Sequence, residues 1–232
     1  MGSFWRKRIS KQMMVCLGII CCCLVFVGQM AEQTATTMLP VDGKIIVLDA
    51  GHGGFDPGKV GTLGEDEKHI NLAIMTKTQQ YLEQGGAIVY VTRLTDEALG
   101  STKQEDMKER QRIANETEGD LLVSIHQNAF PSTSVKGAQV FYHGESTEGK
   151  QLAECVQEQL RLVVDADNTR QAKANSDYYV LRTTNIPAVI VECGFLSNPE
   201  EEQNLNNETY QSQVAWAIYK GIVEYYTQTE MM

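Results

Sequence analysis

The stretch Ile45–Gly54, with the sequence IIVLDAGHGG, constrains the fold of this chain more than any other part of it. A short apolar run ends at Asp49, and a histidine between glycines, His52, follows directly. This pattern predicts a buried strand that opens at its carboxyl end into a tight loop, where a side chain can be presented to a ligand.

Two later stretches have the same form. Leu121–Ala129 (LLVSIHQNA) places His126 at the end of an apolar run, and Ala188–Asn198 (AVIVECGFLSN) places Glu192 at the end of another. The carboxyl ends of parallel strands meet at one edge of an α/β sheet, where such folds place their ligand sites. We therefore expect these metal-binding and proton-transferring groups to converge there, as in a zinc hydrolase.

The rest of the chain alternates strands with helical patterns. Helices are predicted over 71–84, 103–118, 149–164 and 210–226, strands over 87–92, 137–143 and 178–182, and a loop over 165–177. This order predicts a single α/β domain with a mostly parallel sheet of about six strands and helices on both faces. Neither an internal repeat nor a second domain is evident in the sequence.

The N-terminus predicts a membrane anchor. Arg6, Lys7, Arg8 and Lys11 precede Met13–Met30, an uncharged stretch of 18 residues, which is long enough for a signal anchor and short for a spanning helix. A cleaved signal peptide is the alternative, although no small-residue cleavage site follows. Positive charges stay in the cytoplasm, so the remainder is expected outside the membrane. The predicted organisation is an anchor at 1–30, a linker at 31–43 and a catalytic domain at 44–228.

The charge of the exported part excludes some partners. The whole chain carries −10 and its first 30 residues carry +4, which leaves −14 for the remainder. Nucleic acids and anionic membrane surfaces attract clustered cations, so neither is expected as a ligand of this domain. Four of the six cysteines lie in the apolar stretch, and Cys155 and Cys193 are interpreted as small buried residues.

Three side chains are candidate zinc ligands. A catalytic zinc site has three protein ligands and an open position, and His52 and His126 supply two imidazoles. A carboxylate is expected as the third ligand. Glu67, at the start of the first helix, is the best candidate, since the loop after His52 returns through three glycines toward the same edge. Glu65 and Asp66 are close enough to remain alternatives.

Glu192 is then the candidate acid/base. A carboxylate beside a zinc site can accept a proton from the attacking water and return it to a leaving amine. A charge placed directly after four apolar residues is costly to bury without a partner, which favours a functional role over a structural one. A serine or cysteine nucleophile is not favoured, because the chain has no GxSxG motif and Cys193 points to the other face of its strand.

These motifs together resemble the zinc-dependent N-acetylmuramoyl-L-alanine amidases of the type-3 class. The resemblance rests on four ordered blocks over about residues 44–226: LDAGHGG at 48–54, Glu67, SIHQNA at 124–129 and PAVIVECGFLSN at 187–198. Thr92-Arg93 with Asp96, and Arg110 with Ala114-Asn115, are also similar to the family pattern.

The resemblance implies hydrolysis of the amide between the lactyl group of N-acetylmuramic acid and the first L-alanine of the stem peptide. It implies that His52, Glu67 and His126 hold Zn²⁺ and that Glu192 is the catalytic acid/base. Arg182 is a further candidate contact for a peptide carboxylate.

The layout is most similar to the membrane-anchored spore-cortex amidases, which act in muramic-δ-lactam formation. Ala129 and Gly137 are too close in sequence for the inhibitory helix that some relatives insert there. A separate protein is therefore expected to control activity or position. Two alternatives remain: another cell-wall zinc peptidase or deacetylase, and a non-catalytic wall-binding sensor stabilised by zinc.

Overall fold

The computed structural model describes residues 13, 14, 16, 20, 39–63 and 65–230. Residues 39–232 form one compact unit, separate from residues 1–38. Most of the predicted anchor at Met13–Met30 and most of the linker lie outside the described residues. Among the residues that are described, no helix is both long enough and apolar enough to cross a membrane.

In the described part of the chain, six strands form one sheet in the order β2-β1-β3-β6-β4-β5. Their bounds are β1 Ile45–Ala50, β2 Ile88–Val91, β3 Leu121–Asn128, β4 Gln139–Tyr142, β5 Lys173–Ala174 and β6 Ala188–Phe195. β1 pairs in parallel with β2 and β3, and β3 with β6. β4 is antiparallel to β6 and parallel to β5. The prediction of a single α/β domain with a mostly parallel sheet is confirmed.

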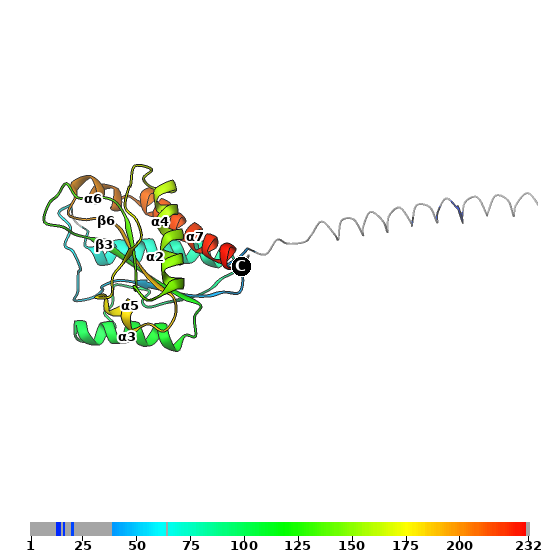
Figure 1. The fold of residues 1–232 in the computed structure, drawn as a ribbon, viewed down its shortest axis with the longest axis horizontal. Coiled ribbons are helices and arrows are strands. Elements are labelled where there is room, and N and C mark those ends of the chain that lie inside the picture. The colour runs from blue at the N-terminus through cyan, green and yellow to red at the C-terminus, as the bar shows by residue number, and fades with distance from the viewer. Residues whose placement is uncertain (1–12, 15, 17–19, 21–38, 64, 231–232) are drawn as a thin grey trace, which may run out of the picture. The chain divides into compact units, whose positions relative to one another are not determined.

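Helices cover both faces of this sheet, as predicted (Figure 1). One face packs against α2 (Glu67–Gln84), α4 (Thr147–Val163) and α7 (Glu208–Glu230), and the other against α3 (Lys103–Glu116) and α5 (Tyr179–Thr183). Each face has its own hydrophobic core: the first lies under α2, α4 and α7, and the second lies under α3 and α5. Successive strand residues point to opposite faces, so Leu48 packs into the first core and its neighbour Val47 into the second. Burying one such side chain contributes roughly 1.5–3 kcal/mol.

Local sequence signals fix several helix ends. Thr102 accepts a hydrogen bond from the Glu105 amide at the start of α3, and Ser146 accepts one from the Gly149 amide at the start of α4. Both are side-chain caps of the kind that satisfy free amides in a first helical turn. Asn198 caps α6 (Pro199–Leu205) in the same way, with proline at the first helical position.

Two local expectations were wrong or incomplete. The strand predicted at 178–182 is the helix α5, whose Leu181 packs into the second core. A segment of five residues is too short for its apolar pattern to distinguish a strand from a helix. The packing of Leu181 against the sheet favours the helix. The predicted loop at 165–177 contains the two-residue strand β5, and α6 was not anticipated. The compact unit begins at Leu39, and Val41 is fully buried.

Candidate active site

His52 lies in the first turn after β1 and has an unusual backbone. Its φ is 63°, in the left-handed region that residues with a side chain seldom adopt. Nδ1 of its ring lies 3.0 Å from Oδ2 of Asp56. A carboxylate at this nitrogen holds the proton on Nδ1 and leaves Nε2 free as a lone-pair donor. Nε2 is the nitrogen that faces the site.

His126 projects from β3, and its position depends on the absence of a side chain at Gly51. A Cβ placed on Gly51 would lie 2.1 Å from Cε1 of His126. The two imidazole rings stand edge to face, with centroids 4.9 Å apart. The glycine beside His52 therefore creates the space that the second histidine fills.

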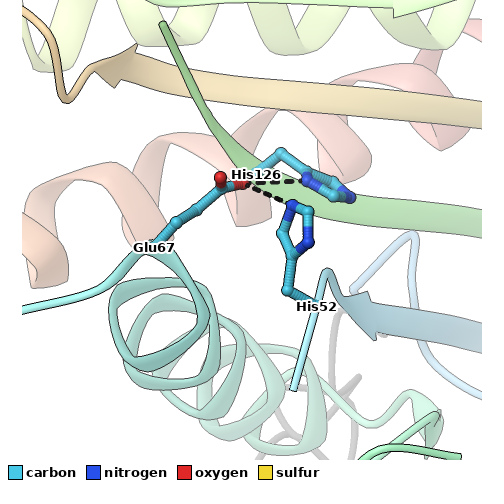
Figure 2. Close-up of side chains that lie close together, drawn as sticks. All are labelled: His52, Glu67 and His126. Atoms are coloured by element: carbon cyan, nitrogen blue, oxygen red, sulfur yellow. Dashed lines mark hydrogen bonds and ion pairs between the residues drawn. The ribbon is translucent and has the colours of Figure 1, made fainter. Parts of the chain in front are cut away.

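Glu67 begins α2 and reaches both histidines (Figure 2). Its Oε1 lies 3.2 Å from Nε2 of His52 and 3.0 Å from Nδ1 of His126. The same oxygen accepts a hydrogen bond from the Gln127 amide, and Oε2 accepts one from the Lys59 amide. Glu67 is 4 % exposed, so these bonds fix the carboxylate in one orientation.

The loop that follows His52 contacts Glu67 through Gly58 and Lys59. Gly58 has a φ of 68°, and a Cβ there would lie 2.5 Å from Oε2 of Glu67 and 2.7 Å from Cδ2 of His52. Further along, the buried Glu202 accepts hydrogen bonds from the amides of Thr62 and Leu63. The return of the loop toward the sheet edge, expected from its glycines, is present in the structure.

Of the three neighbouring acids, Glu67 is the one that reaches the histidines. Glu65 pairs instead with the exposed His69, at 2.8 Å, and Asp66 is the N-cap residue of α2. Periodicity could not separate these three positions. The start of the helix turns only the side chain of residue 67 inward.

His52, Glu67 and His126 thus form a compact donor set. Their ligand atoms all lie within 4.8 Å of one another. Burial alone would raise the pKa of Glu67, but the hydrogen bonds and charges of His126 and His52 outweigh it and lower that pKa well below its usual range. Two imidazole nitrogens and one ionised carboxylate are the donors that zinc takes in hydrolases, so these residues fit that metal.

Glu192 stands beside this set, on β6, in register with His126 of β3. It is 7 % exposed, and its Oε2 has no hydrogen-bond partner. The Tyr178 hydroxyl donates to Oε1 over 3.4 Å. Burial, reinforced by the charge of Glu67, raises the pKa of Glu192 to about 7. A buried carboxylate with one free oxygen can both accept and release a proton near neutral pH.

A cavity of about 280 Å³ opens in front of these residues. The two histidines and Glu192 lie on its sheet side. The opposite walls come from α3 and from the segment around α5, and they include Lys103, Met107, Tyr178, Tyr179 and Val180. The cavity is lined by both apolar and charged side chains.

Sequence reasoning missed the buried network under this cavity. Asp49 accepts hydrogen bonds from Thr92, Ser124 and the guanidinium of Arg110. Burial tends to raise the pKa of Asp49, yet Arg110 and the hydroxyls hold it at about 2. Arg93 donates to the carbonyls of Ala50 and Gly51. The only signal in the sequence was the family-like placement of the two arginines.

The other two histidines, Cys193 and Arg182 lie elsewhere. Cys193 is fully buried in the core shared with α2, α4 and α7, as its alternation with Glu192 predicts. His69 is exposed on α2. Arg182 and His143 line a different cavity from the one that His52 and Glu192 face.

Comparisons with known proteins identify the family of this chain. Residues 46–224 match the family described as "N-acetylmuramoyl-L-alanine amidase", Amidase_3. The germination-specific N-acetylmuramoyl-L-alanine amidase of Bacillus subtilis is 38% identical over an alignment of 234 positions, which covers 96% of this chain and 97% of that protein.

Solved structures agree as well. The CwlD amidase from Clostridioides difficile, solved in complex with the GerS lipoprotein, is 42% identical with a TM-score of 0.78, and the match covers 80% of this chain and 100% of that one. An N-acetylmuramoyl-L-alanine amidase from Clostridium difficile 630 is 34% identical with a TM-score of 0.71, over 79% of this chain and 97% of that one. By sequence and by fold, this chain therefore belongs to the Amidase_3 family and is an N-acetylmuramoyl-L-alanine amidase.

Proposed function

We propose that this enzyme uses zinc to hydrolyse the amide between the lactyl group of N-acetylmuramic acid and the L-alanine of the stem peptide in peptidoglycan. The observation that carries the proposal is the convergence of His52, Glu67 and His126 within 4.8 Å, beside the unpartnered Oε2 of Glu192. Those three residues would hold the metal, and Glu192 would transfer the proton.

In this proposal each residue of the site has its own role in the hydrolysis. When bound, zinc supplies positive charge that polarises the scissile carbonyl and acidifies water. Glu192 accepts the proton of the attacking water at Oε2 and returns it to the leaving nitrogen. Asp56 fixes the proton of His52 on Nδ1, and Glu67 is kept ionised by its two histidine neighbours. Met107 and Val180, on the opposite walls, would offer apolar surface to one side of the substrate.

The cellular role proposed here is maturation of the spore cortex, including muramic-δ-lactam formation. Support comes from the Bacillus subtilis relative, whose name is germination-specific amidase, and from the match along nearly its whole length. A membrane tether at Met13–Met30 would hold the catalytic domain outside the cytoplasm, and in a developing spore this places it between the two membranes. The uncharged stretch and its basic flank are the sequence features behind this proposal.

A separate protein is proposed to control or position the enzyme. The similar amidase from Clostridioides difficile was solved in complex with a lipoprotein, GerS. A lipoprotein of that kind at the same membrane surface as the proposed tether is the class of partner we expect.

Mass analysis of the products tests the reaction. Purified peptidoglycan incubated with the enzyme is expected to release stem peptides that begin with free L-alanine, and a chelator is expected to abolish this release. Cleavage inside the stem peptide, or loss of acetyl groups from the glycan, would contradict the proposal.

Two variants separate the roles of the residues. Glu192→Gln is expected to lose turnover while it keeps stoichiometric zinc, because it lacks the proton acceptor and retains all three ligands. His69→Gln is the matched control, since it removes an exposed histidine that lies outside the donor set. Loss of zinc together with turnover in Glu192→Gln would instead make Glu192 a metal ligand.

A further inference from the structure

The left-handed backbone of His52 requires an explanation. In the described part of the chain, His52 and Glu118 are the residues other than glycine with a positive φ. That conformation is unfavourable for a residue with a Cβ, because the Cβ then lies too close to a carbonyl oxygen of the backbone. It persists only where the surrounding structure holds it.

Arg110 on α3 reaches the carbonyl of His52. Nη2 of Arg110 donates to this oxygen over 2.6 Å, and Nη1 donates to the carbonyl of Ala50 over 2.7 Å. The guanidinium therefore spans the last residue of β1 and the left-handed histidine. Arg110 is 6 % exposed, so water competes little for these bonds.

Two acids fix the guanidinium itself. Nε donates to Oδ2 of Asp106 over 2.6 Å, one helical turn earlier on α3. Nη1 also donates to Oδ1 of Asp49 over 2.6 Å. The planar fork of arginine can make all of these contacts at once, which the single ammonium of lysine cannot do.

The other polar neighbours of this turn do not hold the same atom. Asp56 contacts the ring of His52 at Nδ1 and so orients the imidazole. Arg93 donates to the carbonyls of Ala50 and Gly51, which precede the histidine. Among the described side chains, Arg110 is the donor to the His52 carbonyl.

We propose that Arg110 is a positioning residue that holds the backbone of His52 in its left-handed conformation and thereby presents Nε2 for metal binding. The link to metal rests on the proposed function, and the backbone effect does not. Without the fork, the backbone of His52 can rotate about its N–Cα and Cα–C bonds to a relaxed conformation with a negative φ, and the ring then leaves its place beside Glu67. Arg110 acts through His52 and has no part in the proton transfer.

The test compares zinc affinity and backbone conformation in variants of the full chain. Arg110→Lys keeps the charge between the two acids and loses the fork. Its zinc dissociation constant, measured by competition with a chromophoric chelator, is expected to rise about 10-fold to 100-fold, the usual effect of removing an outer contact of a metal ligand. In a metal-free crystal structure of the variant, the φ of His52 is expected to become negative.

Arg170→Lys is the matched control. Arg170 also donates to a backbone carbonyl, that of Lys136, and does not line the cavity. Its replacement is expected to leave the zinc dissociation constant within about twofold of the wild-type value, since the contacts of His52 are untouched. A loss of affinity in this control equal to that in Arg110→Lys would overturn the assignment of Arg110.

Arg110→Lys can fail to fold, because both of its acidic partners are buried. Asp106→Asn then decides. Asp106 accepts from both the Leu99 amide and Nε of Arg110, and asparagine offers one oxygen to these two donors, which weakens the hold on the guanidinium without removing its charge. A severalfold rise in the dissociation constant and a relaxed backbone at His52 are expected. An unchanged zinc affinity, or a φ that stays near 63°, overturns the proposal. If the wild-type protein binds no zinc, the proposed function fails, and the φ of His52 in these variants still decides the role of Arg110.

Discussion

The imidazole of His126 occupies the space that a side chain at Gly51 would need, with only 2.1 Å between an ideal Cβ and Cε1 of the ring. The ring projects from β3 and the glycine directly follows the neighbouring strand β1, and the Gly51 amide donates to the carbonyl of Ile125. The turn that carries one histidine is thus in direct contact with the strand that carries the other.

We expect Gly51→Ala to displace His126 and to lower kcat/KM at least about 100-fold, since a shift of about 1 Å at a catalytic centre has effects of that size. The free energy of unfolding should fall by only about 1–3 kcal/mol, as for other overpacked sites. Enzyme assays and urea unfolding check the two parts. Gly144→Ala is the control, because a Cβ there would lie 3.6 Å from its nearest neighbour.

The ionisation of Glu192 is expected to affect stability in the metal-free protein. Burial raises its pKa from 4.5 to about 7, so the folded state keeps a proton that the unfolded chain releases in this interval. The stability contributed by this proton is complete below about pH 4.5 and is lost as the pH rises through about 7.

Relative to Glu192→Gln, the wild-type free energy of unfolding should therefore fall by up to about 3 kcal/mol between about pH 5 and about pH 8. Urea unfolding of the chelated proteins at both pH values measures this difference. Other carboxylates, such as Glu67, contribute to both proteins and largely cancel. A difference that does not change with pH would show that Glu192 is not protonated in the fold.

Zinc affinity should decrease as the pH falls. Burial tends to lower the pKa of His126, but the hydrogen bond and charge of Glu67 outweigh this effect and raise that pKa above its ordinary value. Zinc has to displace this proton, so the dissociation constant is expected to rise up to roughly tenfold per pH unit below the pKa. Competition titrations from about pH 5.5 to about pH 8 measure this. A zinc affinity that stays the same across that pH range would count against His126 as a ligand.

Tyr178→Phe should lower kcat about threefold to tenfold with little change in KM, because the Glu192 carboxylate loses one hydrogen bond. The fold should be unaffected, since phenylalanine keeps the edge contact with Phe141 at a centroid distance of 5.5 Å. Steady-state kinetics check this prediction. Tyr219→Phe in α7, which lies away from the cavity, should match wild type in kcat. A normal kcat in Tyr178→Phe would mean that the carboxylate is oriented by the strand alone.

Much of the sheet could be predicted from the sequence, because each buried strand has its own apolar run. The three strand ends with His52, His126 and Glu192 were found in this way, and the structure brings them together. The antiparallel direction of β4 and the pairing of β5 could not be predicted. They depend on which edges remain free after β6 has joined β3, and local periodicity carries no information on that.

The side chains of the site could be predicted from the sequence, but the contacts that hold them in place could not. The sequence by itself determined the residue types at the three strand ends and the glycines that allow close approach, because these are local requirements of turns and strands. Only the tertiary structure decided that Glu67 and not Glu65 reaches the histidines. It also decided that Arg110, 58 residues from His52, bonds its carbonyl. Such contacts depend on how separate elements pack, and the spacing of residues along the chain does not specify that packing.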